Sequence, residues 1–317
     1  MGATPQWLKK VKYDTLYLLV RALIITSGLF PRKLLLWWGS LMGQLSYQIM
    51  PQTRKKTILN LKIAYENVLS EHEVRDFTKK VFVNLGKNAM DTIRAYNIRK
   101  LESLEKIVSI EGIEHFNHAL AKGKGLIALA CHRGAFELIA DVMTLKGYKT
   151  NVMGAALQNK KLDKLLVNYR TAKGARYIQI GQETLTVIKA LKKGEVVAIL
   201  IDQDKKKVKG TFVNFFGKPA YTPIGAALLA LKTGAAVVPT AIRRLPDDKH
   251  LITFTPALDL IRTGNEEQDI KANTQLFTQH IESFIREAPA QWVWMHERWK
   301  HQPEQVIDYA VSSQNSF

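Results

Sequence analysis

The residues best suited to chemistry lie at 126–137, where an apolar run ends in a histidine and a glutamate follows five residues later. On one continuous helix His132 and Glu137 would point about 140° apart, so they can meet only if the chain bends between them. Gly134 permits that bend, and Glu137 would then accept a hydrogen bond from one ring nitrogen of His132. A histidine oriented by a carboxylate is the usual general base. The segment predicts such a base, with a capping histidine and a surface glutamate as the alternative.

Both neighbours of His132 carry side chains with chemistry of their own. Arg133, with the N-terminus of the following helix, adds positive potential for an anionic ligand or a developing oxyanion. Cys131 suggests a Cys–His dyad, but neighbours on a strand point to opposite faces, so we interpret it as a buried, inert thiol. It is the only cysteine, which excludes an internal disulfide framework and a zinc site of the Cys-x-x-Cys type.

A second group of acids, Asp202 and Asp204, follows another apolar run. Two aspartates at this spacing could hold a metal ion for nucleotide-sugar chemistry. The lysines that follow at 205–207 argue against a cation site and favour an anionic ligand. The alternative is that at least one of the two acids only caps the next turn.

Two aromatic segments are candidates for the walls of a site. Residues 210–223 alternate in polarity, as in an excursion that lines an apolar groove or in an ordinary hairpin. Residues 291–300 alternate aromatic and cationic side chains, as in a wall that faces a polar site. Arg170 and Arg176 add positive charge around the fourth predicted strand, although such an arginine is more often a surface residue than a ligand.

The elements that must position these residues begin near residue 106, where short β-rich runs alternate with helical periods. Several of the runs are apolar on both faces, which is typical of buried parallel strands covered by helices. Each intervening helix ends near a glycine, the usual residue just past a helix end. We therefore predict an α/β fold with a mostly parallel central sheet flanked by helices. The predicted strands are 107–111, 126–131, 151–155, 176–180, 196–201, 236–242 and 251–256.

Residues 1–52 form a helical region that we expect to associate with a membrane. Residues 15–30 are apolar except for Arg21, and 34–53 are uncharged but contain polar residues and glycines. Neither is a clean run of about 20 apolar residues, so a pair of buried or interfacial helices competes with a single-pass anchor. Trp37 and Trp38 fit the aromatic belt at a membrane interface.

Length and charge set the remaining bounds. The chain has 317 residues, is 46% hydrophobic and has a net charge of +18, which rules out wholesale disorder and favours acidic or anionic partners. The charge is spread along the chain without a recognisable nucleic-acid-binding motif, so we expect no nucleic-acid partner. The expected division is an N-terminal hydrophobic region (1–52), a basic helical region packed on the body (53–105), an α/β domain (106–304) and a C-terminal tail (305–317).

Five segments in order resemble the lysophospholipid acyltransferase-like superfamily, and more specifically the lauroyl/myristoyl acyltransferases of lipid A biosynthesis. The resemblance covers roughly residues 15–304, nearly the whole chain, and each segment alone is a weak signal. The matching pieces are the basic helix Arg54-Lys-Lys-Thr-Ile-Leu-Asn-Leu, the glycine-bearing run at 112–127, the H-x-x-x-x-E motif of His132 and Glu137, Asp202-Gln-Asp with the block at 212–222, and Trp294-Met-His-Glu-Arg-Trp-Lys.

The resemblance implies a role for each matching residue. His132 would deprotonate an acceptor hydroxyl, which attacks an acyl thioester without a covalent acyl-enzyme, and Glu137 would hold His132 in the right tautomer. Arg170 would meet an acceptor phosphate, and Asp204 would lie near the acceptor. No metal and no cofactor is implied. The expected substrate-binding set is Arg133, Arg170, Asp202, Asp204, Phe216 and Arg298.

The resemblance also implies partners and a location. The donor would be acyl carrier protein or acyl-coenzyme A, and the acceptor an anionic glycolipid such as a lipid A precursor. The protein would lie at the bacterial inner membrane, peripheral or single-pass, with its site on the cytoplasmic face. A glycerophospholipid or aminolipid acceptor is an alternative. A metal-dependent glycosyltransferase that uses Asp202 and Asp204 is a further one, and EDTA would abolish its activity.

Overall fold

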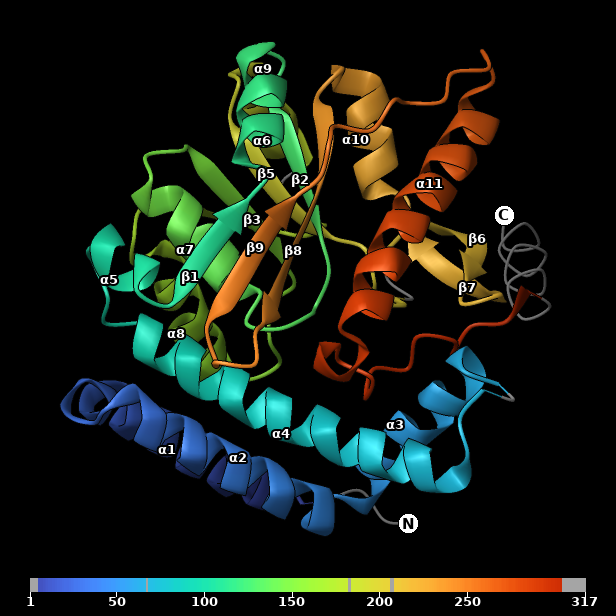
Figure 1. Cartoon of the computed structure of the whole chain (residues 1–317). Coiled ribbons are helices and arrows are strands. Elements are labelled where there is room, and N and C mark those ends of the chain that lie inside the picture. Colours follow the sequence, from blue (N-terminus) through green and yellow to red (C-terminus); the bar gives the residue numbers. More distant parts are fainter. Residues whose placement is uncertain (1–4, 67, 182–183, 206–207, 304–317) are drawn as a thin grey trace.

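The computed structural model of the chain describes residues 5–66, 68–181, 184–205 and 208–303 (Figure 1). The predicted tail at 305–317 and two of the three lysines that follow Asp204 lie outside the described residues. Within the described residues, helices cover both faces of a central sheet, and further helices lie along one end of it.

The central sheet has seven strands in the order β1-β9-β8-β2-β5-β3-β4. All pairs are parallel except β8 with β9, which confirms the predicted mostly parallel sheet. Every predicted strand is present, and its ends differ from the prediction by at most two residues. The strands are β1 (Val108–Glu111), β2 (Leu126–Ala130), β3 (Thr150–Gly154), β4 (Arg176–Gln179), β5 (Val196–Leu200), β8 (Ala236–Arg244) and β9 (His250–Phe254).

Helices cover the sheet because alternate residues of its central strands are apolar on both sides. In β2, Ile127 and Leu129 pack toward α9, α10 and α11, whereas Leu126 and Ala128 pack toward α6 and α7. The predicted glycines end several of these helices with positive φ, as Gly234 does after α10. The helices are α5 (Leu101–Glu105), α6 (Ile113–Ala121), α7 (Glu137–Leu145), α8 (Lys160–Thr171), α9 (Thr184–Lys192), α10 (Gly225–Thr233) and α11 (Glu266–Glu287).

The aromatic segment 210–223 forms an antiparallel hairpin, β6 (Gly210–Phe215) and β7 (Lys218–Pro223), separate from the main sheet. It lies against α11, and Phe215 is fully buried among aromatic rings, one of them Trp292. The sequence left open a groove-lining excursion or an ordinary hairpin, and the structure has the hairpin. Pro223 is its one residue in the wall of the large cavity described below.

The N-terminal helices lie together below the sheet: α1 (Gln6–Thr26), α2 (Arg32–Ile49), α3 (Pro51–Ala64) and α4 (Glu71–Ala95) (Figure 1). The predicted capping box at the start of α4 is present, with Ser70 and Glu73 bonded reciprocally. A Cβ on Gly39 or Gly43 would collide with the backbone of α4, so glycine allows α2 and α4 to touch closely. Among the described residues, no helix combines the length and apolarity needed to cross a membrane.

One buried charge network joins these helices to the sheet. Asp91 of α4 accepts two hydrogen bonds from Arg32 of α2, and it contacts Arg244 of β8 and His250 of β9 at 2.8 Å each. Burial opposes ionisation of Asp91, but the bonds from His250 and Arg32 and the charge of Arg244 outweigh it and hold the pKa of Asp91 well below its ordinary value. The ionised Asp91 therefore stabilises the fold at any pH above the ordinary pKa of an aspartate. This contribution is lost as the pH falls through the lower pKa that Asp91 has in the folded protein.

Replacing Asp91 by alanine should lower the free energy of unfolding by about 3–5 kcal/mol, because it leaves the buried Arg244 and the half-buried Arg32 without this carboxylate. Urea denaturation of the purified protein measures the change. Asp247→Ala is the matched control, since this exposed acid lies in the turn between β8 and β9 and contacts only Lys249. Equal stability of the Asp91 and Asp247 variants would show that the network contributes nothing.

Candidate active site

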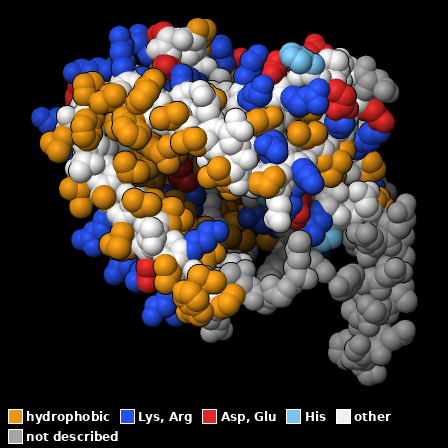
Figure 2. Space-filling view, turned by 90° about the horizontal axis from the view of Figure 1, so that it is seen from below, with side chains coloured by type: hydrophobic (Ala, Val, Ile, Leu, Met, Phe, Trp, Pro, Cys, Tyr) orange, Lys and Arg blue, Asp and Glu red, His pale blue; other side chains and the backbone are white. Residues whose placement is uncertain are grey.

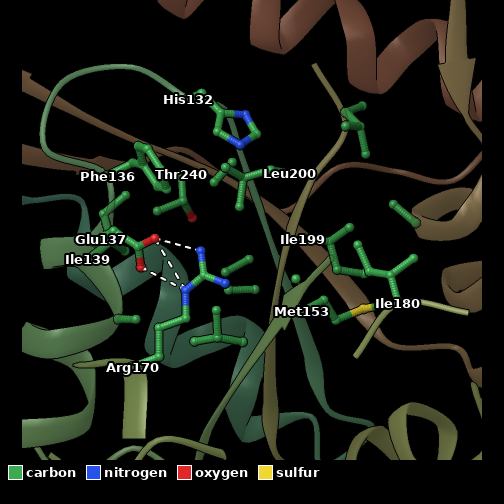
Figure 3. A pocket seen from close by; sticks show the side chains of 18 of the residues that line it. His132, Phe136, Glu137, Ile139, Met153, Arg170, Ile180, Ile199, Leu200 and Thr240 are labelled. Carbon is green, nitrogen blue, oxygen red and sulfur yellow. Dashed lines mark hydrogen bonds and ion pairs between the residues drawn. The ribbon is translucent and has the colours of Figure 1, made fainter. Parts of the chain in front are cut away.

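A cavity of about 390 Å³ lies between one face of the sheet and helices α7 and α8 (Figure 3). Most of its wall is apolar, with Ile139 and Met143 from α7, Leu166 from α8 and Met153 from β3. The polar groups of the wall include His132, Glu137, Arg170 and Thr240, which Figure 3 shows near one another at one side. A largely apolar cavity with a few convergent polar groups is typical of a ligand site.

The empty space arises from small residues that the strand register places side by side. Ala128 of β2 pairs with Ala198 of β5, which pairs in turn with Val152 of β3, and all three face the cavity. Larger side chains in this row would fill the space between the sheet and α7. The row therefore leaves room for an extended apolar chain rather than for a tightly packed core.

The same register brings His132 to Asp202. Ala130 pairs with Leu200 at the carboxyl ends of β2 and β5, and each polar residue follows two positions later. Asp202 Oδ1 lies 2.7 Å from His132 Nδ1, and Oδ2 accepts a hydrogen bond of 2.8 Å from the backbone N–H of His132. The indole N–H of Trp292 donates to Oδ2 at 2.7 Å. The carboxylate thus fixes both the backbone and the ring of His132.

Asp202 is ionised although its side chain is inaccessible to solvent. Burial opposes its ionisation, but the nearby His132 and the hydrogen bonds from His132 and Trp292 outweigh burial and lower the pKa of Asp202 to about 2. An ionised carboxylate only accepts hydrogen bonds, which assigns the Nδ1 proton to His132 and leaves Nε2 free to accept a proton. The ring of Phe136 meets the imidazole edge-on at a centroid distance of 4.9 Å and limits its rotation.

The predicted hydrogen bond between Glu137 and His132 is wrong in this structure, because a different acid holds His132 and a different partner holds Glu137. Arg170 Nη2 lies 2.6 Å from Glu137 Oε1, and Arg170 Nε donates to Oε2 at 3.1 Å. Figure 3 shows this two-point ion pair apart from the His132 ring. Glu137 and Arg170 both stay in the cavity wall, as expected for site residues. Spacing within one segment could not reveal partners that come from the loop after β5 and from α8.

Arg133 does not face the cavity, contrary to the prediction. Its side chain is fully buried on the opposite side of the chain from His132, where it donates to the carbonyl of Ile242 at 3.1 Å and to Glu287 at 2.9 Å. The guanidinium also lies over the ring of Phe284, 5.4 Å from its centroid. Because successive residues at a strand end point in opposite directions, placing His132 in the cavity sends Arg133 toward α11.

Arg298 and Phe216 also lie outside the cavity wall, so the structure does not support their predicted contact with substrate. Arg298 is fully buried and donates to the carbonyl of Tyr221 and to the hydroxyl of Thr222, which ties the C-terminal segment to β7. Phe216 is buried in the turn of the hairpin, 5.7 Å from the ring centroid of Trp294. Both motif residues pack between elements and do not line the cavity.

Asp204 has a histidine of its own. It accepts hydrogen bonds from the backbone N–H of His301 at 3.0 Å and from His301 Nδ1 at 2.6 Å. Asp202 and Asp204 therefore serve two different histidines, and Asp204 is absent from the cavity wall. Within the described residues, no group of three or more His, Cys, Asp and Glu side chains is arranged to hold a metal ion.

Cys131 is buried beside the site, as expected, and burial raises the pKa of its thiol strongly. Phe136 and Thr240 belong to the site without any signal in the sequence pattern, whereas Trp292 comes from the aromatic segment 291–300 and contacts Asp202. Asn60 of the basic helix has a structural role that its motif did not indicate: its amide donates to the carbonyls of Trp294 and His296 and so fixes α3 to the C-terminal segment.

Residues 5–301 match the family described as bacterial lipid A biosynthesis acyltransferase. The lipid A biosynthesis lauroyltransferase of Escherichia coli K12 is 27% identical over 95% of this chain and 94% of its own length. The lipid A biosynthesis palmitoleoyltransferase of the same strain is 24% identical over 86% of this chain and 87% of its own length. A phosphatidylinositol mannoside acyltransferase of Mycobacterium tuberculosis H37Rv is 26% identical over 64% and 63%, respectively. The family match spans the N-terminal helices, the sheet and the cavity.

Proposed function

Since this chain belongs to the bacterial lipid A biosynthesis acyltransferase family, we propose that it transfers a fatty acyl chain from an acyl thioester to a hydroxyl of a lipid A precursor or related glycolipid. That the protein is an acyltransferase follows from the family and from its relatives. The observation that supports this reaction best is an apolar cavity whose polar side carries a histidine fixed by a buried carboxylate.

The proposed base is Nε2 of His132. It takes the proton of the acceptor hydroxyl while the hydroxyl oxygen bonds to the thioester carbonyl carbon, and Asp202 stabilises the imidazolium that forms. The tetrahedral intermediate then collapses with loss of the carbon–sulfur bond. The imidazolium returns its proton to the leaving thiolate, so the free thiol and the new ester leave His132 neutral again.

The ion pair of Glu137 and Arg170 takes a role distinct from that of the base. Its position in the cavity wall puts the Arg170 guanidinium within reach of bound substrate, and the two-point contact with Glu137 fixes the direction of the guanidinium. A planar guanidinium of this kind suits a phosphate of an anionic acceptor. We therefore keep Arg170 as the proposed acceptor-binding residue and assign Glu137 to its orientation.

The donor and the location follow from charge and chemistry. The net charge of +18 suits an acidic carrier protein as the donor, and acyl-coenzyme A is the other thioester of the same class. A lipid acceptor and the exposed apolar side chains of α1 and α2 favour the inner membrane surface, with the site on the cytoplasmic face where such thioesters occur. A hydroxyl of another membrane glycolipid is the second candidate acceptor, since one relative is a phosphatidylinositol mannoside acyltransferase.

Mass spectrometry of total lipids and lipid A from cells with and without the gene tests the acceptor. Loss of one acyl chain from lipid A supports the proposal and also identifies the chain length. Loss of an acyl group from another glycolipid would support the proposed acyl transfer but identify that glycolipid as the acceptor. Unchanged lipids in cells that normally express the protein would contradict the proposal.

The row of small residues predicts an effect on chain length. Ala198→Leu should fill the space beside Ala128 and lower kcat/KM for long-chain donors by about 10- to 200-fold, because several methylenes lose their place. Short-chain donors that end before this row should be used nearly as well as by wild type. Competition between donors of different length in one reaction measures the shift. An equal loss for all lengths would mean that the acyl chain lies elsewhere.

A further inference from the structure

We propose that Lys205 is a second phosphate-binding residue of the cavity, separate from Arg170 and suited to the phosphate of the thioester donor. The identity of that donor rests on the proposed function. Lys205 follows directly after Asp204, and the proposed reaction leaves this lysine without a role.

Alternate residues of the segment that follows β5 line the cavity. Ile201, Gln203 and Lys205 belong to its wall. The two acids between them, Asp202 and Asp204, do not. A period of two is that of side chains along an extended chain. The charge of Lys205 therefore faces the cavity, whereas the carboxylates beside it lie outside the wall.

Hydrogen bonds fix the backbone on both sides of Lys205. Before it, Asp204 accepts hydrogen bonds from the backbone N–H and from the ring of His301. After it, the N–H of Val208 donates to the carbonyl of Lys205 at 2.9 Å. The Asp204–His301 contact has the same two-point form as the contact that holds the base, but His301 is absent from the cavity wall. We therefore assign Asp204 and His301 to the positioning of Lys205.

The wall offers Lys205 no counter-charge of its own. In the part of the wall that the structure describes, Glu137 is the one acid, and Arg170 holds it. The acids beside Lys205 in the chain are each bonded to a histidine. A charged group in a largely apolar cavity is costly unless an opposite charge pairs with it. A bound anion would supply that charge, and lysine is a common ligand of phosphate.

Lys205 belongs to the strand end that holds the base. It is three residues from Asp202, whose carboxylate fixes His132. Burial is the main cause that lowers the pKa of His296 to about 4, and the charges of Lys205 and His132 add to it. His296 is therefore neutral at physiological pH, which leaves Lys205 as the permanent cation of the wall at this strand end.

The donor is the substrate whose phosphate best matches this position. Both donor classes hold the acyl group on a pantetheine arm, with the sulfur at one end and a phosphate at the other. The sulfur must lie near His132, which returns a proton to the leaving thiolate, so the arm starts at this strand end. The acceptor phosphate already has Arg170, from α8. Figure 2 shows the lower face of the molecule hollowed beside its apolar side chains, with Lys and Arg side chains on part of the rim.

Two donors that differ only in the phosphate test the site with the full-length protein: acyl-phosphopantetheine and acyl-pantetheine. Wild type should use the phosphorylated donor with a kcat/KM about 10-fold higher or more, because a charge-assisted hydrogen bond depends on the phosphate. Lys205→Met should remove most of this preference by raising KM for the phosphorylated donor. Lys209→Met is the matched control and should keep the preference, since Lys209 is exposed in the same segment and lies outside the wall.

A second variant tests the positioning of Lys205. Asp204→Asn should weaken the contact with His301 and lower the preference for the phosphorylated donor by a few-fold. Combined with Lys205→Met, it should lower the preference no further, because it acts through Lys205. A loss shared equally by both donors would mean that Asp204 supports only the fold, and would contradict its positioning role.

The acceptor is the other source of a phosphate, and the same variant distinguishes the two sources. Lys205→Met could leave the donor preference unchanged and raise KM for the acceptor, but not for the same acceptor after removal of its phosphate. That result would support the phosphate site and assign it to the acceptor. If the variant changes neither preference, or slows all substrates equally with and without phosphate, Lys205 binds no phosphate and the proposal is wrong.

A binding measurement separates this proposal from the proposed function. Isothermal titration calorimetry with phosphopantetheine and with pantetheine requires no acyl transfer. Tighter binding of phosphopantetheine by wild type, but not by Lys205→Met, would support the site even if no ester forms. Acyl transfer without any dependence on phosphate, in binding or in rate, would reject the role of Lys205 and keep the enzyme.

Discussion

Replacing His132 by alanine should lower kcat by at least about 100-fold, because the acceptor hydroxyl then has no base to take its proton. The initial rate of acyl transfer by purified protein, at saturating donor and acceptor, measures the effect. The fold should persist, since the His132 side chain is partly exposed and lines an existing cavity.

Thermal unfolding of His132→Ala shows whether this variant is folded. The control variant is Cys131→Ser, which changes the preceding side chain but no side chain of the cavity wall. A His132→Ala protein that is folded and has a rate within a few-fold of wild type would remove His132 from the mechanism.

Asp202→Asn should lower kcat by at least about 100-fold, close to the loss expected when the base itself is removed. The amide has almost the shape of the carboxylate, but it cannot stabilise the imidazolium and it permits the wrong ring tautomer. KM should change little, because the Asp202 side chain is buried behind His132 and does not reach a substrate. Steady-state kinetics at neutral pH, where the depressed pKa of about 2 keeps the wild-type Asp202 ionised, gives the comparison.

Glu137→Gln is the matched comparison for Asp202→Asn. It removes the charge that orients Arg170, so we expect KM for the acceptor to rise. If the two acids act on separate groups, the double variant should lose activity by the product of the single losses. If Asp202→Asn is nearly as active as wild type and the double variant is no less active than Glu137→Gln alone, then Glu137 and not Asp202 orients His132.

Much of the fold could be predicted because its elements have local signals. The apolar runs of β2 and β5 and the cap of Ser70 and Glu73 depend only on residues close in the chain, and all are present. The antiparallel β8–β9 pair is the departure from a parallel sheet. It had a local signal, since the short connection between the two strands leaves no room for the crossover that a parallel pair needs.

Only those features of the site that depend on a single stretch of sequence could be predicted. His132 and its position at a strand end are correct, but its partner Asp202 comes from the loop just after β5, 70 residues away along the chain. Arg133 and Arg298 looked like ligands because they are charged motif residues. Their burial against backbone carbonyls depends on how α11 and β7 pack, which the sequence pattern does not specify. The cavity itself required the register of Ala128 with Ala198.

The most direct test of the central claim is the product formed by purified protein from a lipid A precursor and an acyl thioester, followed by mass spectrometry. The account predicts a lipid that gains one acyl ester, one free thiol released per ester formed, and neither product with His132→Ala. Ester formation that continues undiminished in the folded His132→Ala protein, or no ester with any thioester donor offered, would contradict it.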